Sequence, residues 1–151
     1  MSSLAWRLQF GLLLAGMAAA GGVHAVDFRS VGATPAVMFD APSEKGRKVF
    51  VAPRGMPVEV VLSYGEWMKV RDAGGDLAWI EARSLVPKRM LMVTAVNGKI
   101  RASADDAAPL VLTADRGVLL ELAEPVSSGW IKVRHRDGGT GFIKATDVWG
   151  D

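Results

Sequence analysis

One segment that occurs twice constrains the fold of this chain more than any other feature. Residues 67–80 read WMKVRDAGGDLAWI and residues 130–143 read WIKVRHRDGGTGFI, aligned without a gap at an offset of 130 − 67 = 63. Each segment has alternating apolar and polar residues on both sides of a Gly-Gly turn, which is typical of a β-hairpin. Similarity at a fixed offset indicates a repeated structural unit. We therefore expect two copies of one small unit.

The similarity continues on both sides of the hairpin. Each copy ends in a short polar-then-apolar segment, ARSLV in the first copy and ATDVW in the second. Upstream the offset is 62, with one residue added in the second copy, and the matches are Arg54-Gly55 with Arg116-Gly117 and Glu59 with Glu121. We therefore place the two units at Ala36–Val86 and Met90–Trp149, joined by Pro87-Lys88-Arg89.

The N-terminal residues are typical of a secretory signal sequence. Arg7 precedes an apolar run from Phe10 to Ala20, and a tail of small residues ends at Ala25. This order predicts a signal helix over residues 1–25, cleaved after Ala25. A membrane anchor is the alternative, but the run is shorter than the roughly 20 residues that a spanning helix needs. We expect secretion across the inner membrane to the periplasm, or beyond it, with only transient membrane contact.

The length and charge of the remaining chain limit what it can do. Cleavage would leave 151 − 25 = 126 residues, enough for one ordinary domain or two very small ones. Without Arg7, 17 basic residues face 16 acidic ones, and neither half carries a large positive excess. This balance argues against a nucleic-acid partner, which would require clustered positive charge. The chain has no cysteine, so packing alone must stabilise it.

Each unit is expected to be all-β. Short runs of β-branched and aromatic residues alternate with Gly, Pro and Asp at close spacing. Because an open sheet of five short strands would leave exposed edges, a small closed barrel is the economical arrangement. The predicted fold is two tandem barrels, residues 26–88 and 89–151, behind the signal helix. The expected strands of the first copy are Ala36–Asp40, Lys48–Val51, Val58–Ser63, Glu66–Asp72 and Leu77–Ala82, before a helical turn at Arg83–Leu85; those of the second are Met90–Ala95, Leu110–Thr113, Val118–Leu122, Gly129–Arg136 and Gly141–Lys144.

These motifs resemble the bacterial SH3 domain family. The resemblance rests on a strand ending in Arg-Gly, then VEVV, a W-x-K-V-R strand, a Gly-rich turn and an aromatic-Ile pair. KIRAS in the second copy and, less closely, FDAPS in the first occupy the place of the family's opening motif. The resemblance covers most of residues 36–149 and implies SH3-like barrels of exported bacterial proteins. Such barrels target the cell wall or bind proteins, and they are commonly attached to a hydrolase domain. We find no hydrolase motif in this sequence.

The hairpin register assigns each side chain to a face of the sheet. With a three-residue loop at Gly74–Asp76, Val70 lies opposite Ile80 and Met68 lies opposite Ala82, which makes an apolar inner face. A two-residue loop would mix apolar and charged side chains on both faces. We therefore expect the three-residue loop.

This register predicts an exposed stripe on the outer face. In the first copy Lys69 would lie opposite Glu81, and Arg71 would lie opposite Trp79 in a cation–π contact of about 0.5–1 kcal/mol. In the second copy Lys132 would face Lys144. Exposed aromatic side chains beside arginines are typical of binding surfaces. The candidate ligand-binding residues are Tyr64, Trp67, Arg71, Trp79, Trp130, Arg134 and Phe142.

A structural role for the same side chains is the alternative. A tryptophan can cover the small core of a barrel of about 60 residues. The two stripes could also pack against each other, because the linker between the units is short. Both alternatives remain open at the level of sequence.

Nothing in the sequence indicates catalysis. The one histidine after residue 25, His135, lies in a hairpin loop beside charged residues, as solvated turn residues do. The absence of cysteine excludes thiol chemistry and thiolate zinc sites. Asp105-Asp106 is expected to be solvated, and neither Gly-Gly turn precedes a helix that could hold a phosphate. We expect no catalytic residue, cofactor or metal.

The expected function is therefore binding. The chain is interpreted as a non-enzymatic, exported module of the bacterial cell envelope that recognises peptidoglycan or its peptide stems. The alternative is a periplasmic adaptor or accessory subunit that binds an extended segment of an envelope protein.

Overall fold

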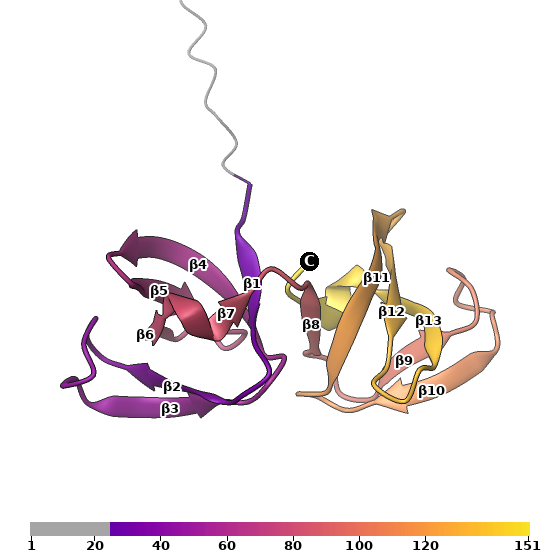
Figure 1. Ribbon diagram of the computed structural model, residues 1–151. Coiled ribbons are helices and arrows are strands. Elements are labelled where there is room, and N and C mark those ends of the chain that lie inside the picture. The colour runs from indigo at the N-terminus through magenta and orange to yellow at the C-terminus, as the bar shows by residue number, and fades with distance from the viewer. Residues whose placement is uncertain (1–24) are drawn as a thin grey trace, which may run out of the picture.

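The computed structural model describes residues 25–151, and the predicted signal helix lies outside these residues apart from Ala25. The described chain forms two seven-stranded antiparallel sheets, one after the other in sequence and side by side in space (Figure 1). We call them the first barrel and the second barrel. Only two single-turn 3-10 helices, η1 (Ala82–Ser84) and η2 (Ala145–Asp147), interrupt the strands. No helix in residues 25–151 has the length and apolar character needed to cross a membrane.

The two sheets have the same strand order. In the first barrel it is β3-β2-β6-β5-β4-β1-β7, and in the second it is β10-β9-β13-β12-β11-β8-β14. The strands of the first barrel are β1 (Phe28–Val31), β2 (Ala36–Phe39), β3 (Lys48–Ala52), β4 (Pro57–Tyr64), β5 (Trp67–Arg71), β6 (Leu77–Glu81) and β7 (Leu85–Val86). Those of the second are β8 (Met90–Val93), β9 (Gly98–Arg101), β10 (Leu110–Ala114), β11 (Leu119–Ser127), β12 (Trp130–Arg134), β13 (Thr140–Lys144) and β14 (Val148–Trp149).

The all-β fold and the tandem repeat are confirmed, and the structure adds strands that the repeat did not reveal. β1 pairs with β4 and β7, as β8 pairs with β11 and β14. The first unit therefore begins at Phe28 and not at Ala36. No strand was predicted at β9, where only the KIRAS motif was noted. The predicted strand Met90–Ala95 ends at Val93. Each sheet also keeps two edges, so the barrels are curled and not closed by hydrogen bonds.

Each barrel has its own core, built from inward-facing side chains of its sheet. The repeated hairpin supplies the centre of each core, with Val70 and Ile80 in the first and Val133 and Ile143 in the second. All four are at most 1% exposed. The alternation of the repeated sequence thus serves burial.

The hairpin register differs from the expected one by two residues. Val70 lies opposite Ala78 and not Ile80, and the turn is at residues 73–75. The carboxylate of Asp72 fixes this turn, because it accepts the backbone N–H of Gly74 and that of Asp76, each at 2.9 Å. A shift of two residues keeps every side chain on its expected face, so the apolar pattern could not detect it.

An aromatic seam joins the two barrels. Phe28 of β1 packs edge-on against Trp149 of β14, with ring centroids 5.1 Å apart. The guanidinium of Arg89 lies 5.4 Å from the Phe28 ring and donates to the carbonyl oxygen of Gly150 at 2.8 Å. Met92 of β8 packs against the core of the first barrel. These contacts set the orientation of one barrel against the other.

Candidate functional site

The outer face of the first barrel carries an aromatic cluster. Trp67 on β5 and Trp79 on β6 are half-buried there, although the sequence predicted an exposed stripe. The reason is Phe39 on β2, which lies edge-on to Trp67 at 5.5 Å, is paired with Trp79 in the sheet and is 5% exposed. Sequence reasoning missed Phe39. The run AVMF is apolar on both faces of β2, a signal that this strand is covered on both sides.

Tyr64 extends the cluster to solvent. It is 66% exposed, and its ring lies 6.4 Å from that of Trp79. The Lys69 ammonium lies 6.0 Å from the Trp79 ring, because the two residues are opposite each other in the sheet. The expected contact of Arg71 with Trp79 is therefore wrong. Arg71 lies opposite Leu77 and forms an ion pair with Glu59 at 2.7 Å.

A groove of about 550 Å³ runs beside Trp79. Its apolar wall includes the half-exposed Phe50 of β3 and Leu77 of β6. Asp40 and Asp76 add carboxylates to its rim. The first barrel thus offers an open groove with an aromatic wall next to Tyr64.

The outer face of the second barrel carries charged side chains around its aromatic residues. Trp130 and Phe142 are half-buried at the positions of Trp67 and Trp79, but Arg101 replaces Phe39 opposite Phe142. The expected Lys132–Lys144 pair is wrong, since Lys144 lies opposite Trp130, with its ammonium 5.8 Å from the ring.

Two lysines on this face form ion pairs with carboxylates. Lys144 forms an ion pair with Asp106 at 2.8 Å, which lowers the pKa of that carboxyl group below its ordinary value. Lys132 forms an ion pair with Glu124 at 3.0 Å. No exposed aromatic residue corresponds to Tyr64, because Ser127 occupies its place opposite Trp130.

The aromatic clusters do not face each other. The seam between the barrels uses Phe28 and Trp149, so the alternative in which the two stripes pack against each other is wrong. Only Arg134 among the seven candidate residues reaches the space between the barrels. The structure brings Tyr64, Trp67 and Trp79 together, and it leaves Trp130 and Phe142 on a separate surface.

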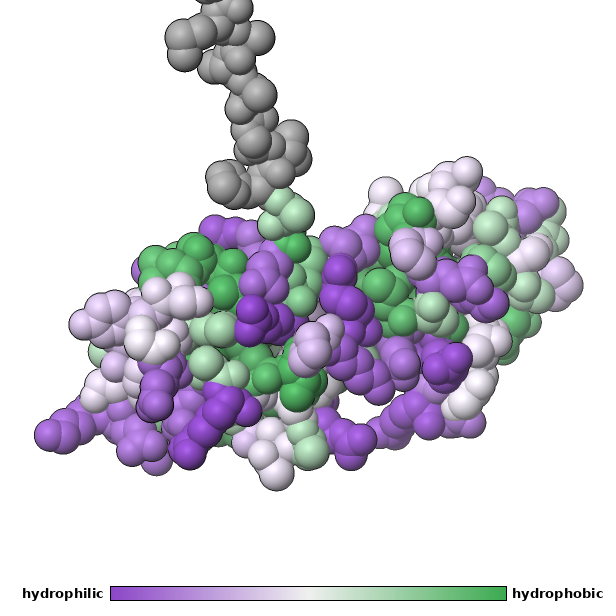
Figure 2. All heavy atoms as spheres, turned by 45° about the horizontal axis from the view of Figure 1, so that its top comes forward, coloured by the Kyte–Doolittle hydropathy of each residue, from purple (hydrophilic) through white to green (hydrophobic). Residues whose placement is uncertain are grey.

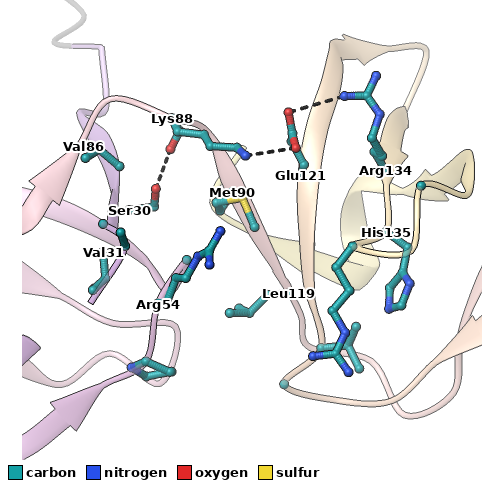
Figure 3. Close-up of a pocket in the computed structure, with 18 residues that line it drawn as sticks. Ser30, Val31, Arg54, Val86, Lys88, Met90, Leu119, Glu121, Arg134 and His135 are labelled. Carbon is teal, nitrogen blue, oxygen red and sulfur yellow. Dashed lines mark hydrogen bonds and ion pairs between the residues drawn. The ribbon is translucent and has the colours of Figure 1, made fainter. Parts of the chain in front are cut away.

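A basic cleft of about 970 Å³ lies between the barrels (Figure 3). Its walls are the 53–55 turn of the first barrel, the linker, and the β12–β13 turn of the second barrel. Glu121 forms ion pairs with Lys88 at 3.1 Å and with Arg134 at 3.5 Å, as the dashed lines in Figure 3 show. Ser30 donates to the carbonyl oxygen of Lys88 at 2.7 Å and anchors the linker. Hydrophilic residues gather at this junction in Figure 2.

The β12–β13 turn also carries a histidine. The Nδ1 atom of His135 lies 3.0 Å from the Asp137 carboxylate. The pKa of Asp137 is lowered, first by the backbone N–H of Gly139 and then by His135. Residues 25–151 contain no group of three His, Cys, Asp or Glu side chains placed to hold a metal ion.

Comparison with known proteins identifies the repeat. The family model described as "Bacterial SH3 domain" matches the chain twice, at residues 32–87 and 94–150. No curated protein matches the chain. Solved structures of NlpC2 and NlpC1 from Trichomonas vaginalis are each 13% identical to it, with TM-scores of 0.38 and 0.39. Those matches cover 84% and 88% of this chain and about half (49%) of each of the other chains.

Proposed function

Since the chain belongs to the bacterial SH3 domain family, we propose that it is a non-enzymatic, exported module that binds peptidoglycan in the cell envelope. Family membership supports a cell-wall-related binding role for both barrels. Export rests on the signal pattern of residues 1–25. The non-enzymatic character rests on the sequence, in which His135 is the one histidine after residue 25 and cysteine is absent.

The aromatic surface of the first barrel is the observation that carries the proposal. Tyr64 is exposed, Trp79 forms one wall of a groove, and Phe50 is 50% exposed on another. Rigid aromatic side chains at a groove are the usual anchors of binding sites. Trp67 and Phe39 pack beneath this surface and hold it in place. The function therefore uses the exposed edge of a cluster whose buried part is structural.

Sedimentation with purified, protein-free sacculi tests the proposal. The processed chain is expected to leave the supernatant with the wall. Tyr64→Ser and Trp79→Phe install the residues that the second copy has, so they should preserve the fold. We expect the double substitution to weaken binding by roughly thirtyfold, as the loss of an interface hot spot does.

The control for this experiment is Val126→Ala, which removes an exposed apolar side chain of the second barrel (45% exposed). It should sediment like the wild type. Wild-type protein that stays in solution at low and moderate salt would contradict peptidoglycan binding. Equal binding by the double variant would keep the wall as ligand but remove the aromatic surface from the site.

The adaptor function has one specific observation in its favour. β3 is an edge strand, and its central side chains Val49, Phe50 and Val51 are 44%, 50% and 60% exposed. An apolar edge strand can accept an added strand from a partner protein. A photo-reactive residue at position 50 that captures a specific envelope protein in cells, with no depletion on sacculi, would favour this function.

A further inference from the structure

We propose that the basic cleft between the barrels is a second binding site, which takes the carboxylate groups of a peptidoglycan peptide stem. This inference rests on the proposed function and extends it, because it names the part of the wall polymer and a separate place where it binds. The ligand chemistry is a short peptide with several carboxylates and small apolar side chains.

The cleft concentrates positive charge in a chain that is otherwise nearly neutral. Residues 25–151 carry 17 − 16 = +1, since Arg7 is the only charged residue before them. The cleft lining carries 4 − 1 = +3, from Arg54, Lys88, Arg134 and Arg136 against Glu121. The rest of the described chain therefore carries −2. Such a concentration of positive charge attracts an anion to the cleft.

Two of the four cations are available to a ligand. Lys88 and Arg134 share Glu121, whose charge they more than balance. Arg54 and Arg136 come from opposite sides of the cleft, and neither forms an ion pair with any described acidic residue. Both are exposed. A guanidinium group presents a planar fork of donors that fits a carboxylate.

The floor of the cleft is apolar. Met90 of β8 and Leu119 of β11 lie on it, both half-buried. A Cβ atom on Gly55, where φ is +80°, would lie 3.4 Å from Met90 Cε and 3.7 Å from Leu119 Cδ1. The 53–55 turn therefore closes directly onto these side chains. A ligand with methyl groups between its carboxylates suits such a floor below a basic rim.

The contacts of the seam preorganise the two walls of the cleft. Phe28, Trp149 and Arg89 join the barrels beside it, so the two walls do not have to be brought together when a ligand binds. A volume of about 970 Å³ is at the upper end for small-molecule sites, which fits several peptide residues and exceeds a single ion. A polynucleotide would instead need an extended row of cations, which the −2 charge outside the cleft does not supply.

The internal repeat shows that an arginine at position 136 is not a requirement of the fold. Arg134, His135 and Arg136 stand where the first barrel has Arg71, Asp72 and Ala73. In the first barrel Asp72 builds the turn and Arg71 pairs with Glu59. The same hairpin thus folds with an acidic turn. In the copy whose turn faces the cleft, the turn carries Arg136 beside Asp137, and Arg136 lines the cleft.

Titration of a soluble, reduced disaccharide-tetrapeptide into the processed chain, followed by NMR, tests the inference. We expect shifts at Arg54, Arg136 and their neighbours. Arg54→Gln and Arg136→Gln should each weaken binding about tenfold, the effect of losing one charged hydrogen bond. Amidation of the peptide carboxylates should weaken it at least as much, and added salt should weaken it further.

The repeat supplies a matched control. Arg116, the counterpart of Arg54, is not part of the cleft lining and donates to the carbonyl oxygen of Thr94. Arg116→Gln should bind like the wild type. Unchanged binding in Arg54→Gln and Arg136→Gln, or equal binding of the amidated peptide, would overturn the inference.

The outcome separates this inference from the proposed function. If the two cleft variants sediment with sacculi as the wild type does and the tetrapeptide causes no shifts in the cleft, the cleft site is wrong and peptidoglycan binding stands. If the wild type does not sediment, the proposed function fails first. Shifts in the cleft with inorganic phosphate but not with the tetrapeptide would assign the cleft to phosphate groups and overturn the carboxylate assignment.

Discussion

The two barrels share their inner faces and differ on their outer faces. The central core residues Val70 and Ile80 of the first hairpin recur as Val133 and Ile143 in the second. On the outer face, Arg101 replaces Phe39 and Ser127 replaces Tyr64. Burial therefore constrains one side of the sheet, and the other side is free to acquire a different chemistry in each copy.

This difference separates structural from functional aromatic residues. Trp67 of the first barrel and Trp130 of the second occupy equivalent positions, and both are half-buried. The position of Tyr64 is aromatic only in the first barrel, where the side chain is exposed. A repeat inside one chain thus acts as its own control, because a partly buried aromatic residue that recurs in both copies is explained by folding.

The largest expected effect on stability comes from substituting Phe39, the buried residue of the outer face. Phe39→Ala should lower the free energy of unfolding of the first barrel by about 3–5 kcal/mol, because it empties the space below Trp67. Arg101→Ala in the second barrel should cost about 1–2 kcal/mol, the value of its hydrogen bond to the Ala108 carbonyl and its packed stem. Hydrogen exchange resolved by barrel measures both. Equal losses would contradict the difference between the outer faces.

A smaller effect is expected where the cores differ by one methyl group. A Cβ atom on Gly141 would lie 2.5 Å from Ile100 Cγ2 and 2.9 Å from the Arg101 carbonyl oxygen. Gly141→Ala should therefore cost about 1–3 kcal/mol through overpacking. The first barrel has Ala78 at this position, opposite Val70 and packed against the core, and Ala78→Gly should cost about 0.5–1 kcal/mol. Thermal unfolding compares them, and a neutral Gly141→Ala would show that β9 can shift.

The seam tests whether the barrels act as one body. Phe28→Ala and Trp149→Ala should remove an edge-on aromatic contact with a coupling free energy of about 0.5–1.5 kcal/mol in a double-mutant cycle. Each barrel should stay folded but tumble more independently. NMR relaxation of the two barrels measures this. Unchanged common tumbling in the double variant would mean that other contacts set the orientation.

The smallest expected effect is a difference in acid sensitivity. The pKa of Asp106 is lowered chiefly by its hydrogen bond to Lys144, and that of Asp137 chiefly by the backbone N–H of Gly139. A lowered pKa in the folded state stabilises the fold above the ordinary Asp pKa, and this stabilisation is lost as pH falls through the folded value.

Both of these carboxylates belong to the second barrel and are exposed, so the second barrel should lose slightly more stability than the first below about pH 4. Hydrogen exchange at pH 5 and pH 3 measures the loss in each barrel. Asp106→Asn together with Asp137→Asn should abolish the difference. A first barrel that weakens first would contradict it.

Much of the fold could be predicted from the sequence, because the repeat marks the elements directly. The hairpin strands and their buried faces follow from period-two alternation. β1 could not be found this way, since FRSV and its counterpart MLMV share only their final valine. The register could not be found either, because the Asp72 side chain fixes the turn through two backbone N–H groups.

The site was harder to predict for the same reason. The sequence identifies Trp67 and Trp79 as outer-face residues, but their burial depends on Phe39, which arrives from a strand distant in sequence. The sequence shows Arg54 only as a repeated residue that matches Arg116. Its position in a cleft depends on how the second barrel is placed.

The sequence by itself determined the tandem repeat, the all-β units and which side chains face each core, because alternation and self-similarity are local properties of the chain. Only the tertiary structure decided which outer-face residues are exposed and where charge gathers. Net charge sums over the whole chain, whereas the cleft brings Arg54 and Arg136 together from two barrels. Their meeting depends on the seam between Phe28 and Trp149, a contact between residues at opposite ends of the described chain.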